Sequence, residues 1–422
     1  MTSRRRFALL AICYLGFVSL GLPDTLIGVA WPSVRDHFRL AQDHVAWIFF
    51  GSGCSYLLSS FFAGRLLARM NVGLLLAGSS ALVALGGFNH GLATVWPWFV
   101  LGALLHGLGS GAIDAGLNHY VATRLPARHM NWLHASYSVG AMLGPVVMTA
   151  SLTLAGSWRL GYLLVAALLG ALALVFLASR ARWLDAAPAE DSTGAAPRES
   201  LHEPPTLPHP EPTRGGSRGA RQALGHRAVR LNLVLFFLYT GFELGLGQWS
   251  FTILTESRNV PAATAGAWVT VYWAGILIGR FLLGFVVDRM SIDRLVRGSL
   301  VTALLGAALF VWNPLPQAAP VALALGGLGL AVVFPCLMTR TPQRVGHGLA
   351  GHAIGLQVGA AMLGGAALPS LGGVVAEHMG VERVAPMLLI VAAILLVLHE
   401  RLVRITGGGD GPAGSPEVSG TS

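Results

Sequence analysis

The segment Val139-Gly-Ala-Met-Leu-Gly144 occurs a second time in this chain, as Val358-Gly-Ala-Ala-Met-Leu-Gly364. Three other short matches have nearly the same separation, about 216 to 221 residues. They are Ala46-Trp47 with Ala267-Trp268, Gly64 and Arg69-Met70 with Gly284 and Arg289-Met290, and Thr123-Arg-Leu-Pro126 with Thr339-Arg-Thr-Pro342. Each match is weak alone, but the shared separation indicates two related halves.

The composition places both halves in a membrane. Only 11% of the 422 residues are charged and 54% are hydrophobic, whereas a soluble domain has about 25% charged residues. Twelve apolar stretches are long enough to cross a bilayer as helices. They cover about 7–31, 44–67, 71–90, 95–122, 132–155, 158–179, 229–256, 263–287, 295–313, 317–339, 349–375 and 383–403.

These stretches predict an all-α membrane protein of twelve transmembrane helices in two six-helix bundles related by pseudo-twofold symmetry. Parallel repeats of this kind place a substrate site near the midplane, between the halves. We expect an N-terminal bundle at 1–179, a disordered cytoplasmic linker at 180–229, a C-terminal bundle at 230–404 and a disordered tail at 405–422. The linker is rich in Pro, Ala, Glu, Arg and Gly and has no periodic apolar pattern.

The arginines indicate the orientation. With both termini in the cytoplasm, 22 arginines lie in cytoplasmic segments, five in external loops and one, Arg280, within a span. This asymmetry follows the positive-inside rule. It also explains the net charge of +9 without nucleic-acid binding. We expect a multi-pass protein of a bacterial inner membrane, monomeric, with both termini cytoplasmic.

One stretch points to a family. Gly279-Arg-Phe-Leu-Leu-Gly284, followed by Asp288-Arg289-Met290, resembles the short cytoplasmic loop motif of the major facilitator superfamily. The first half has a degraded copy, Gly64-Arg65 with Arg69-Met70, which lacks the usual acid. The resemblance covers essentially the whole chain, and it implies the same twelve-helix, two-bundle fold.

Four segments are similar to the fucose:proton symporter branch of that superfamily. They are Gly21-Leu-Pro-Asp24…Gly28…Pro32, Gly107-Leu-Gly-Ser-Gly111…Asp114…Asn118, Asn131-Trp-Leu-His134…Gly140…Gly144-Pro145 and Gly241-Phe-Glu243…Gly247-Gln-Trp249. Fucose permease has acids in its first and fourth helices that serve sugar and proton handling. By resemblance, Asp24 and Asp114 take these roles, although no sugar-specific signature is present.

Three carboxylates interrupt apolar stretches: Asp24, Asp114 and Glu243. An acid in hydrocarbon costs at least a few kcal/mol, so such residues face a cavity or a partner. Asp114 and Asn118 continue a helix face that begins with glycines, which allow close helix approach. Asp24 follows Pro23, which weakens the helix locally. Two of these acids have a purely structural alternative to a role in transport. Asp114 would then only hydrogen-bond a neighbouring helix, and Glu243 would only pair with an arginine.

Other residues are weaker candidates for the cavity. Gln248 and Trp249 fit a sugar site, in which an aromatic surface is combined with polar hydrogen bonds. The remaining candidates are His134, Tyr137, Tyr272, Trp273 and Gln357. Charges near the loop motifs are candidates for a cytoplasmic gate that pairs in one conformation and separates in another: Arg65, Arg69, Arg280, Asp288 and Arg289.

The sequence therefore predicts a secondary transporter that carries a small polar solute such as a sugar together with protons. A drug or metabolite exporter of the same fold is the nearest alternative, and a transport-inactive receptor or scaffold is another. The sequence contains no P-loop, HExxH or CxxC motif, and its match to GxSxG, Gly215-Gly-Ser-Arg-Gly219, lies in the expected linker and not at a strand-to-helix turn, so it is not a nucleophile elbow. ATP-driven transport, a metal or other cofactor and enzymatic activity therefore have no support. The expected partners are the solute, protons and lipid.

Overall fold

The computed structural model describes residues 3–125, 128–183, 216–286, 289–315 and 317–407. Within these ranges all regular structure is helical. The first half contains α1 (Ser3–Asp24), α2 (Leu26–Phe38), η1 (Gln42–His44), α3 (Val45–Leu67), α4 (Val72–Leu92), α5 (Trp96–Arg124), α6 (Arg128–Ala155), α7 (Trp158–Ser179) and η2 (Arg180–Trp183). The second contains α8 (Gly216–Gly225), α9 (Arg227–Thr252), η3 (Ile253–Ser257), α10 (Ala262–Val286), α11 (Ile292–Trp312), α12 (Ala318–Leu330), α13 (Val333–Thr339), α14 (Thr341–Val345), α15 (His347–Met379), η4 (Val381–Arg383) and α16 (Val384–Thr406).

Twelve helical segments of the described chain are long and apolar enough to cross a membrane. Each overlaps one of the twelve expected stretches, so the predicted fold class is confirmed. The first span is longer than expected and runs from Leu9 to Phe38. Its helix continues through the charged pair Arg35-Asp36 to the left-handed cap at Arg39.

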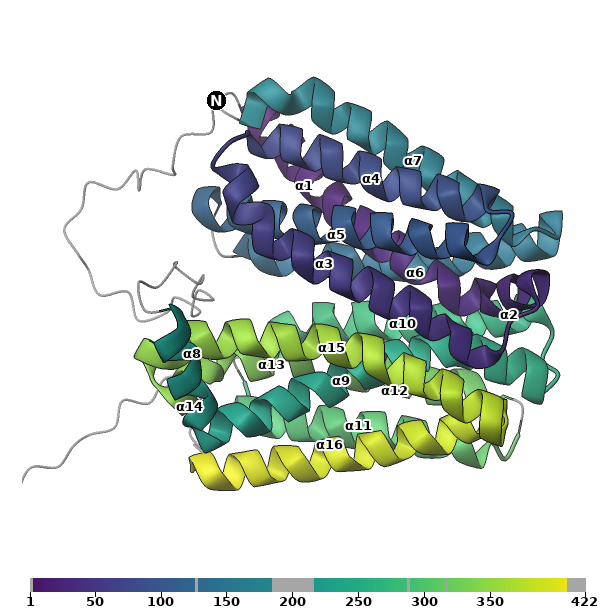
Figure 1. Ribbon diagram of the computed structural model, residues 1–422. Helices are drawn as coiled ribbons and strands as arrows, with labels where there is room; N and C mark the ends of the chain where they lie inside the picture. Colours follow the sequence, from purple (N-terminus) through teal and green to yellow (C-terminus); the bar gives the residue numbers. More distant parts are fainter. Residues whose placement is uncertain (1–2, 126–127, 184–215, 287–288, 316, 408–422) are drawn as a thin grey trace, which may run out of the picture.

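The helices form two bundles, α1–α7 above and α9–α16 below in Figure 1. The last glycine of the repeated motif has the same structural role in both. A side chain on Gly144 of α6 would collide with the Leu22 backbone carbonyl in α1, and one on its counterpart Gly364 of α15 would collide with that of Phe237 in α9. In each half the repeat therefore packs the fifth span closely against the first.

The expected disordered linker differs in part from the structure. Residues 216–225 form α8, which packs against α9 and α15. Its Gly219 lies against the His352 ring, and the Ala223 side chain is fully buried. Most of the expected linker (184–215) and of the expected tail (408–422) lies outside the described residues.

The two ends of the molecule differ in how closely the bundles meet. We call the end where α1 begins and α16 ends the terminal face, and the end where α2 ends and α3 begins the distal face. At the distal face a side-chain carbon on Gly373 of α15 would touch Gln42 and Asp43 of η1, and Gly53 of α3 lies against Ala366. The bundles are therefore in close contact at this end.

Towards the terminal face, α15 and α3 diverge (Figure 1). Gly359 follows Gly373 and Ala366 on one helix face, at intervals of seven residues. Added side-chain carbons on Gly359 and Gly355 would have no neighbour within 4 Å. The molecule is thus closed at the distal face and open between α3 and α15 at the terminal face, while α6 and α10 stay in contact.

Candidate functional site

The first span is interrupted at its central acid. Helix α1 ends at Asp24 and α2 begins at Leu26, with Thr25 between them. Pro23 lacks an N–H for the helical ladder, and the Thr25 hydroxyl donates to the Ala141 carbonyl of α6 at 3.0 Å. The helix is therefore interrupted where Pro23 was expected to weaken it, and the Asp24 carboxylate lies at this break.

Asp24 has a partner on each of two neighbouring helices. The Tyr137 hydroxyl of α6 donates to Oδ2 at 2.8 Å, and His106 Nε2 of α5 lies 2.8 Å from Oδ1. The Asp24 side chain keeps 33% of its surface exposed, against 12% for His106. A carboxylate that is bonded yet open to solvent can exchange a proton with it, and the imidazole offers a second position for that proton.

Asp114 lies in the same bundle but is more enclosed. The Tyr56 hydroxyl of α3 donates to Oδ2 at 2.8 Å, and the Asn118 amide donates to Oδ1 at 2.9 Å. Side chains on Gly107 and Gly111 would collide with the α3 backbone, so the predicted close helix approach is confirmed. Both Asp114 oxygens therefore have protein donors, and this carboxylate joins α3 to α5.

Glu243 forms an ion pair with an arginine, Arg280, which is the structural role considered for it from the sequence. Its Oε1 lies 3.6 Å from Arg280 Nη2, and the Glu243 side chain is buried. Arg280 also donates to the Ser138 hydroxyl at 2.8 Å and towards the His134 carbonyl at 3.4 Å. Since Ser138 belongs to α6 and Arg280 to α10, the guanidinium joins the two bundles.

The acids at the two helix centres are connected through α6. Tyr137 of α6 donates a hydrogen bond to Asp24. Ser138, the next residue of α6, accepts one from Arg280. Arg280 in turn pairs with Glu243. Asp24 and Glu243 are 219 residues apart, which is the separation of the repeats. They are therefore pseudo-symmetric acids on the first span of each half. We call Asp24, His106, Tyr137, Glu243 and Arg280 the central cluster.

The remaining cavity candidates differ in their surroundings. Tyr272 donates to the Glu243 backbone carbonyl at 2.7 Å and lies beside the central cluster. His134 is exposed and packs edge-on against Phe17, with ring centroids 5.4 Å apart. Gln248 is buried, and its backbone lies against Gly28 of α2.

Three other aromatic and amide candidates are packed inside the C-terminal bundle. Trp249 is fully buried and donates to the Pro369 carbonyl at 2.9 Å. Gln357 is fully buried and accepts from the Thr341 hydroxyl at 3.1 Å. Trp273 packs against Tyr272, with ring centroids 5.1 Å apart. The structure does not bring Trp249 or Gln357 to the central cluster: the Trp249 N–H and the Gln357 side-chain oxygen bond within the C-terminal bundle.

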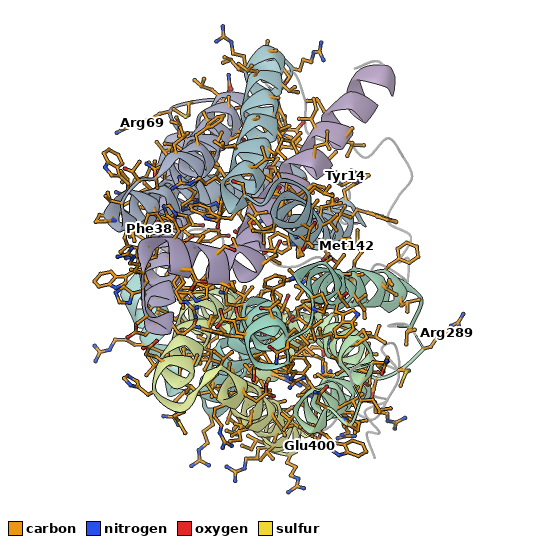
Figure 2. All side chains as sticks on the ribbon, turned by 90° about the vertical axis from the view of Figure 1, so that its right-hand side faces the viewer. Tyr14, Phe38, Arg69, Met142, Arg289 and Glu400 are labelled. Carbon is orange, nitrogen blue, oxygen red and sulfur yellow. The ribbon has the colours of Figure 1, made fainter. Side chains whose placement is uncertain are left out.

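The expected gate residues do not form one group. Figure 2 shows Arg69 and Arg289 projecting from the surface of different bundles, and Arg65 lies over the Phe62 ring, 5.3 Å from its centroid. Asp288 lies outside the described residues. Arg280 is separate from these and belongs to the central cluster.

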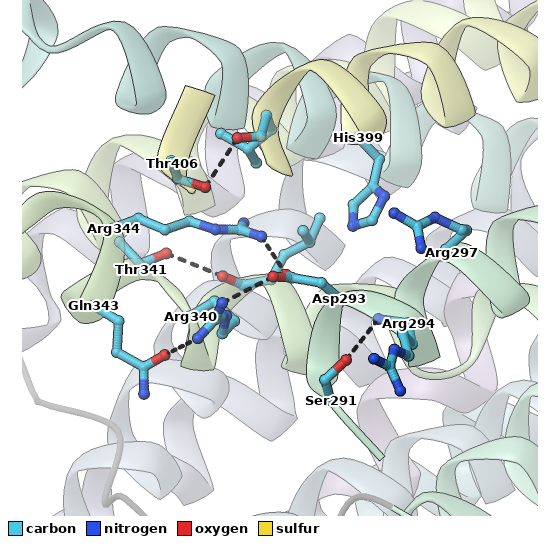
Figure 3. Close-up of polar contacts among 12 residues, drawn as sticks. Ser291, Asp293, Arg294, Arg297, Arg340, Thr341, Gln343, Arg344, His399 and Thr406 are labelled. Atoms are coloured by element: carbon cyan, nitrogen blue, oxygen red, sulfur yellow. Dashed lines mark hydrogen bonds and ion pairs between the residues drawn. The ribbon is translucent and has the colours of Figure 1, made fainter. Parts of the chain in front are cut away.

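A charge network at the terminal face is built instead on Asp293, at the start of α11 (Figure 3). Asp293 accepts from Arg340 at 2.8 Å and from Arg344 at 2.7 Å. The Arg344 side chain is only 2% exposed. Burial lowers the pKa of this guanidinium from its usual value, and Asp293 opposes that shift by stabilising the charged form. This network holds α11 to the α13–α14 corner.

Three residues of the site were not predicted from the sequence: His106, Tyr56 and Ser138. His106, Ser110 and Asp114 follow at intervals of four residues, so they share one face of α5, and the Ser110 hydroxyl lies 3.4 Å from His106 Nε2. That spacing was the available signal for His106. Tyr56 and Ser138 gave none, because their partners come from other helices.

The chain is similar to several named proteins, among them sugar transporters. The chain is 25% identical over 344 residues to the glucose/mannose transporter GlcP of Bacillus subtilis, covering 77% of this chain and 78% of that one. It is 22% identical over 387 residues to the sodium-dependent glucose transporter 1A of Mus musculus, covering 86% and 89%. It is 24% identical over 405 residues to bypass of stop codon protein 6 of Saccharomyces cerevisiae, covering 92% and 80%.

Solved structures share the fold. A bacterial homologue of the human lysosomal transporter Spinster, inward-facing and unoccupied, superposes with a TM-score of 0.73 at 12% identity, covering 96% of this chain and 98% of that chain. The transporter FucP in its outward conformation gives 0.59 at 15% identity, covering 93% and 98%. The family model of the Major Facilitator Superfamily matches residues 13–369 and again 231–412. The chain belongs to the Major Facilitator Superfamily.

Proposed function

We propose that this protein is a proton-coupled symporter that moves a small polar solute such as a sugar by alternating access. The observation that carries the proposal is Asp24, a partly exposed carboxylate at a helix break, bonded to Tyr137 and His106. In this proposal both termini are cytoplasmic, so the open terminal face is the inward-facing state.

The charges along the proposed passage favour a cationic coupling ion. Among the described residues, Glu243 has a guanidinium partner, that of Arg280. Asp24 faces the His106 imidazole, which is charged only if protonated, and Asp114 has only the neutral donors Tyr56 and Asn118. Between the bundles the effective dielectric is low, so excess negative charge is costly unless a proton or another cation neutralises it. A proton on Asp24 reduces the charge imbalance, and it turns one carboxyl oxygen into a donor that can bind a solute hydroxyl.

The solute class is supported by chemistry and by relatives. Tyr137, His106 and Asp24 present hydroxyl, imidazole and carboxylate groups, which match the alternating donors and acceptors of a sugar. Relatives named as glucose/mannose and sodium-dependent glucose transporters support the same class. The second name also makes sodium a specific alternative coupling ion.

Uptake into proteoliposomes tests both the proposed solute and the proposed coupling ion. Purified protein is given labelled glucose under an inward proton gradient, an inward sodium gradient or no ion gradient, with the membrane potential clamped. The proposal expects faster uptake with the proton gradient and no response to sodium. If only the sodium gradient accelerated uptake, sodium and not the proton would be the coupling ion. Uptake of glucose that neither gradient changes would contradict ion-coupled symport.

A further inference from the structure

A shallow hollow of about 330 Å³ lies at the terminal face, between the start of α9 and the end of α16. Its lining is Arg227, Arg230, Leu231, Val234 and Ile405. The two helices pack directly against each other (Figure 1). The hollow belongs to the outer side of the C-terminal bundle and contains no residue of the central cluster.

The polar part of the hollow is purely cationic. Arg227 and Arg230 are exposed and three residues apart, so they share one face of α9. Within the described part of the chain, neither guanidinium has a carboxylate partner. Arg401 and Arg404, both exposed, lie on the last turns of α16. Four arginines around the ends of two helices make this edge strongly positive, which favours an anionic ligand.

The rest of the hollow is apolar and continues along the membrane-spanning helices. Val234 is 45% exposed and Ile405 is 54% exposed. On α16 the exposed face continues through Val397 and Ile394, at 52% and 42%. A soluble phosphate would use only the arginines. A ligand that uses the whole hollow needs an anionic head and a hydrocarbon chain that runs along the span.

We propose that this hollow binds an anionic phospholipid, with its phosphate between Arg227 and Arg230 and its acyl chain against Leu231, Val234 and Ile405. Guanidinium groups bind phosphate oxygens in a two-pronged geometry. The location fits the ligand, because arginine-rich helix ends of the cytoplasmic side meet the leaflet that carries anionic lipids. The site is independent of the transported solute.

Native mass spectrometry of the full-length protein in detergent tests the proposal, with phosphatidylglycerol and phosphatidylcholine as probes. Phosphatidylglycerol is expected to bind at least tenfold more tightly. Because each basic residue near a membrane surface contributes about a five-fold gain in affinity, Arg227→Gln with Arg230→Gln should weaken it about 25-fold. Equal affinity of the wild type and this double variant for phosphatidylglycerol would overturn the site.

A matched variant controls for net charge. Arg180→Gln with Arg182→Gln removes two exposed arginines from the same face of the other bundle, and phosphatidylglycerol affinity should stay within two-fold of the wild type. Val234→Gln should weaken phosphatidylglycerol several-fold, because it makes the wall polar. If millimolar inorganic phosphate displaces the lipid from the wild type, the site is one for a soluble anion and the proposal fails.

Hydrogen exchange of the wild-type protein provides a test that needs no variant. Phosphatidylglycerol should slow exchange in 227–234 and 401–406 relative to phosphatidylcholine, because the lipid covers these helix ends. Protection confined to other segments would place the lipid elsewhere and contradict the proposal.

Discussion

At the scale of single residues, Asp24 is expected to carry the coupled proton. In Asp24→Asn the amide keeps the size of the side chain and its bond from Tyr137, but it cannot bind and release a proton. Uptake driven by a pH gradient should fall at least tenfold, while exchange of labelled for unlabelled solute at equal pH continues. Loss of both activities would show that Asp24 serves solute binding alone, and full pH-driven uptake would exclude it from coupling.

The pair of Glu243 and Arg280 gives a second prediction at this scale. Arg280→Gln removes the cation from a buried carboxylate, which should cost about 1 to 3 kcal/mol of stability. Glu243→Gln should cost less, because Arg280 keeps the Ser138 hydroxyl and the His134 carbonyl. The double variant should be more stable than Arg280→Gln alone. Thermal unfolding of the three variants in one detergent measures this order, and strictly additive losses would contradict the pairing.

The same residues show how much of the site could be predicted from the sequence. Asp24, Asp114 and Glu243 were identifiable because a charge in an apolar stretch is rare and costly. His106, Tyr56 and Ser138 were not, since uncharged polar groups in membrane helices are common and become informative only when another helix brings a partner. Trp249 is the reverse case. A tryptophan suits a sugar site, but this side chain is buried within the C-terminal bundle and packs between helices.

At the scale of elements, a set of polar bonds holds the distal face closed. Glu256 of η3 accepts from Arg35 of α2 and from the Gln42 side chain, each at 3.0 Å. Glu377 of α15 accepts from the Gln42 backbone N–H at 2.7 Å. These bonds join the two bundles, so they must break when the distal face opens.

Glu256→Gln should therefore shift the population towards opening at the distal face. A cysteine at the buried Ala366, which packs against Gly53 of the other bundle at the distal face, reports this shift when the exposed Cys54 is replaced by serine. Its labelling rate should rise several-fold in Glu256→Gln. Glu382→Gln is the matched control, because Glu382 pairs with Arg258 inside one bundle. An equal rise in the control would show general loosening instead of release of the distal contacts.

The elements themselves were largely predictable, for a physical reason. A bilayer-spanning helix needs about 20 apolar residues, so the twelve stretches were visible from hydropathy alone. Helix α8 was not visible, because it has few apolar residues and is held by packing against α9 and α15. The extension of the first span to Phe38 was also missed, since the charged pair Arg35-Asp36 lies beyond the apolar stretch. The ion-pair partner of Arg35, Glu256, comes from the other half of the chain.

At the scale of the whole molecule, alternating access requires the terminal face to close. The face of α15 that carries Gly373 and Ala366 already touches the N-terminal bundle, and the next positions on that face, Gly359 and Gly355, do not. Rocking of the bundles about the α6–α10 contact would bring these glycines towards α3. Nothing lies against them in the present state, and the proposed closure would need their small size.

Gly359→Leu should therefore hold the protein in the present, terminal-open state. Transport should fall at least tenfold, while solute binding and folding persist, because the added side chain has open space around it here. The matched control is Gly298→Leu on α11, another helical glycine whose added carbon meets nothing within 4 Å, and it should transport normally. Both changes favour the helix by about 1 kcal/mol, so stability alone cannot separate them. If both variants transport at the wild-type rate, closure does not bring α15 against α3, and the bundles move about a different contact.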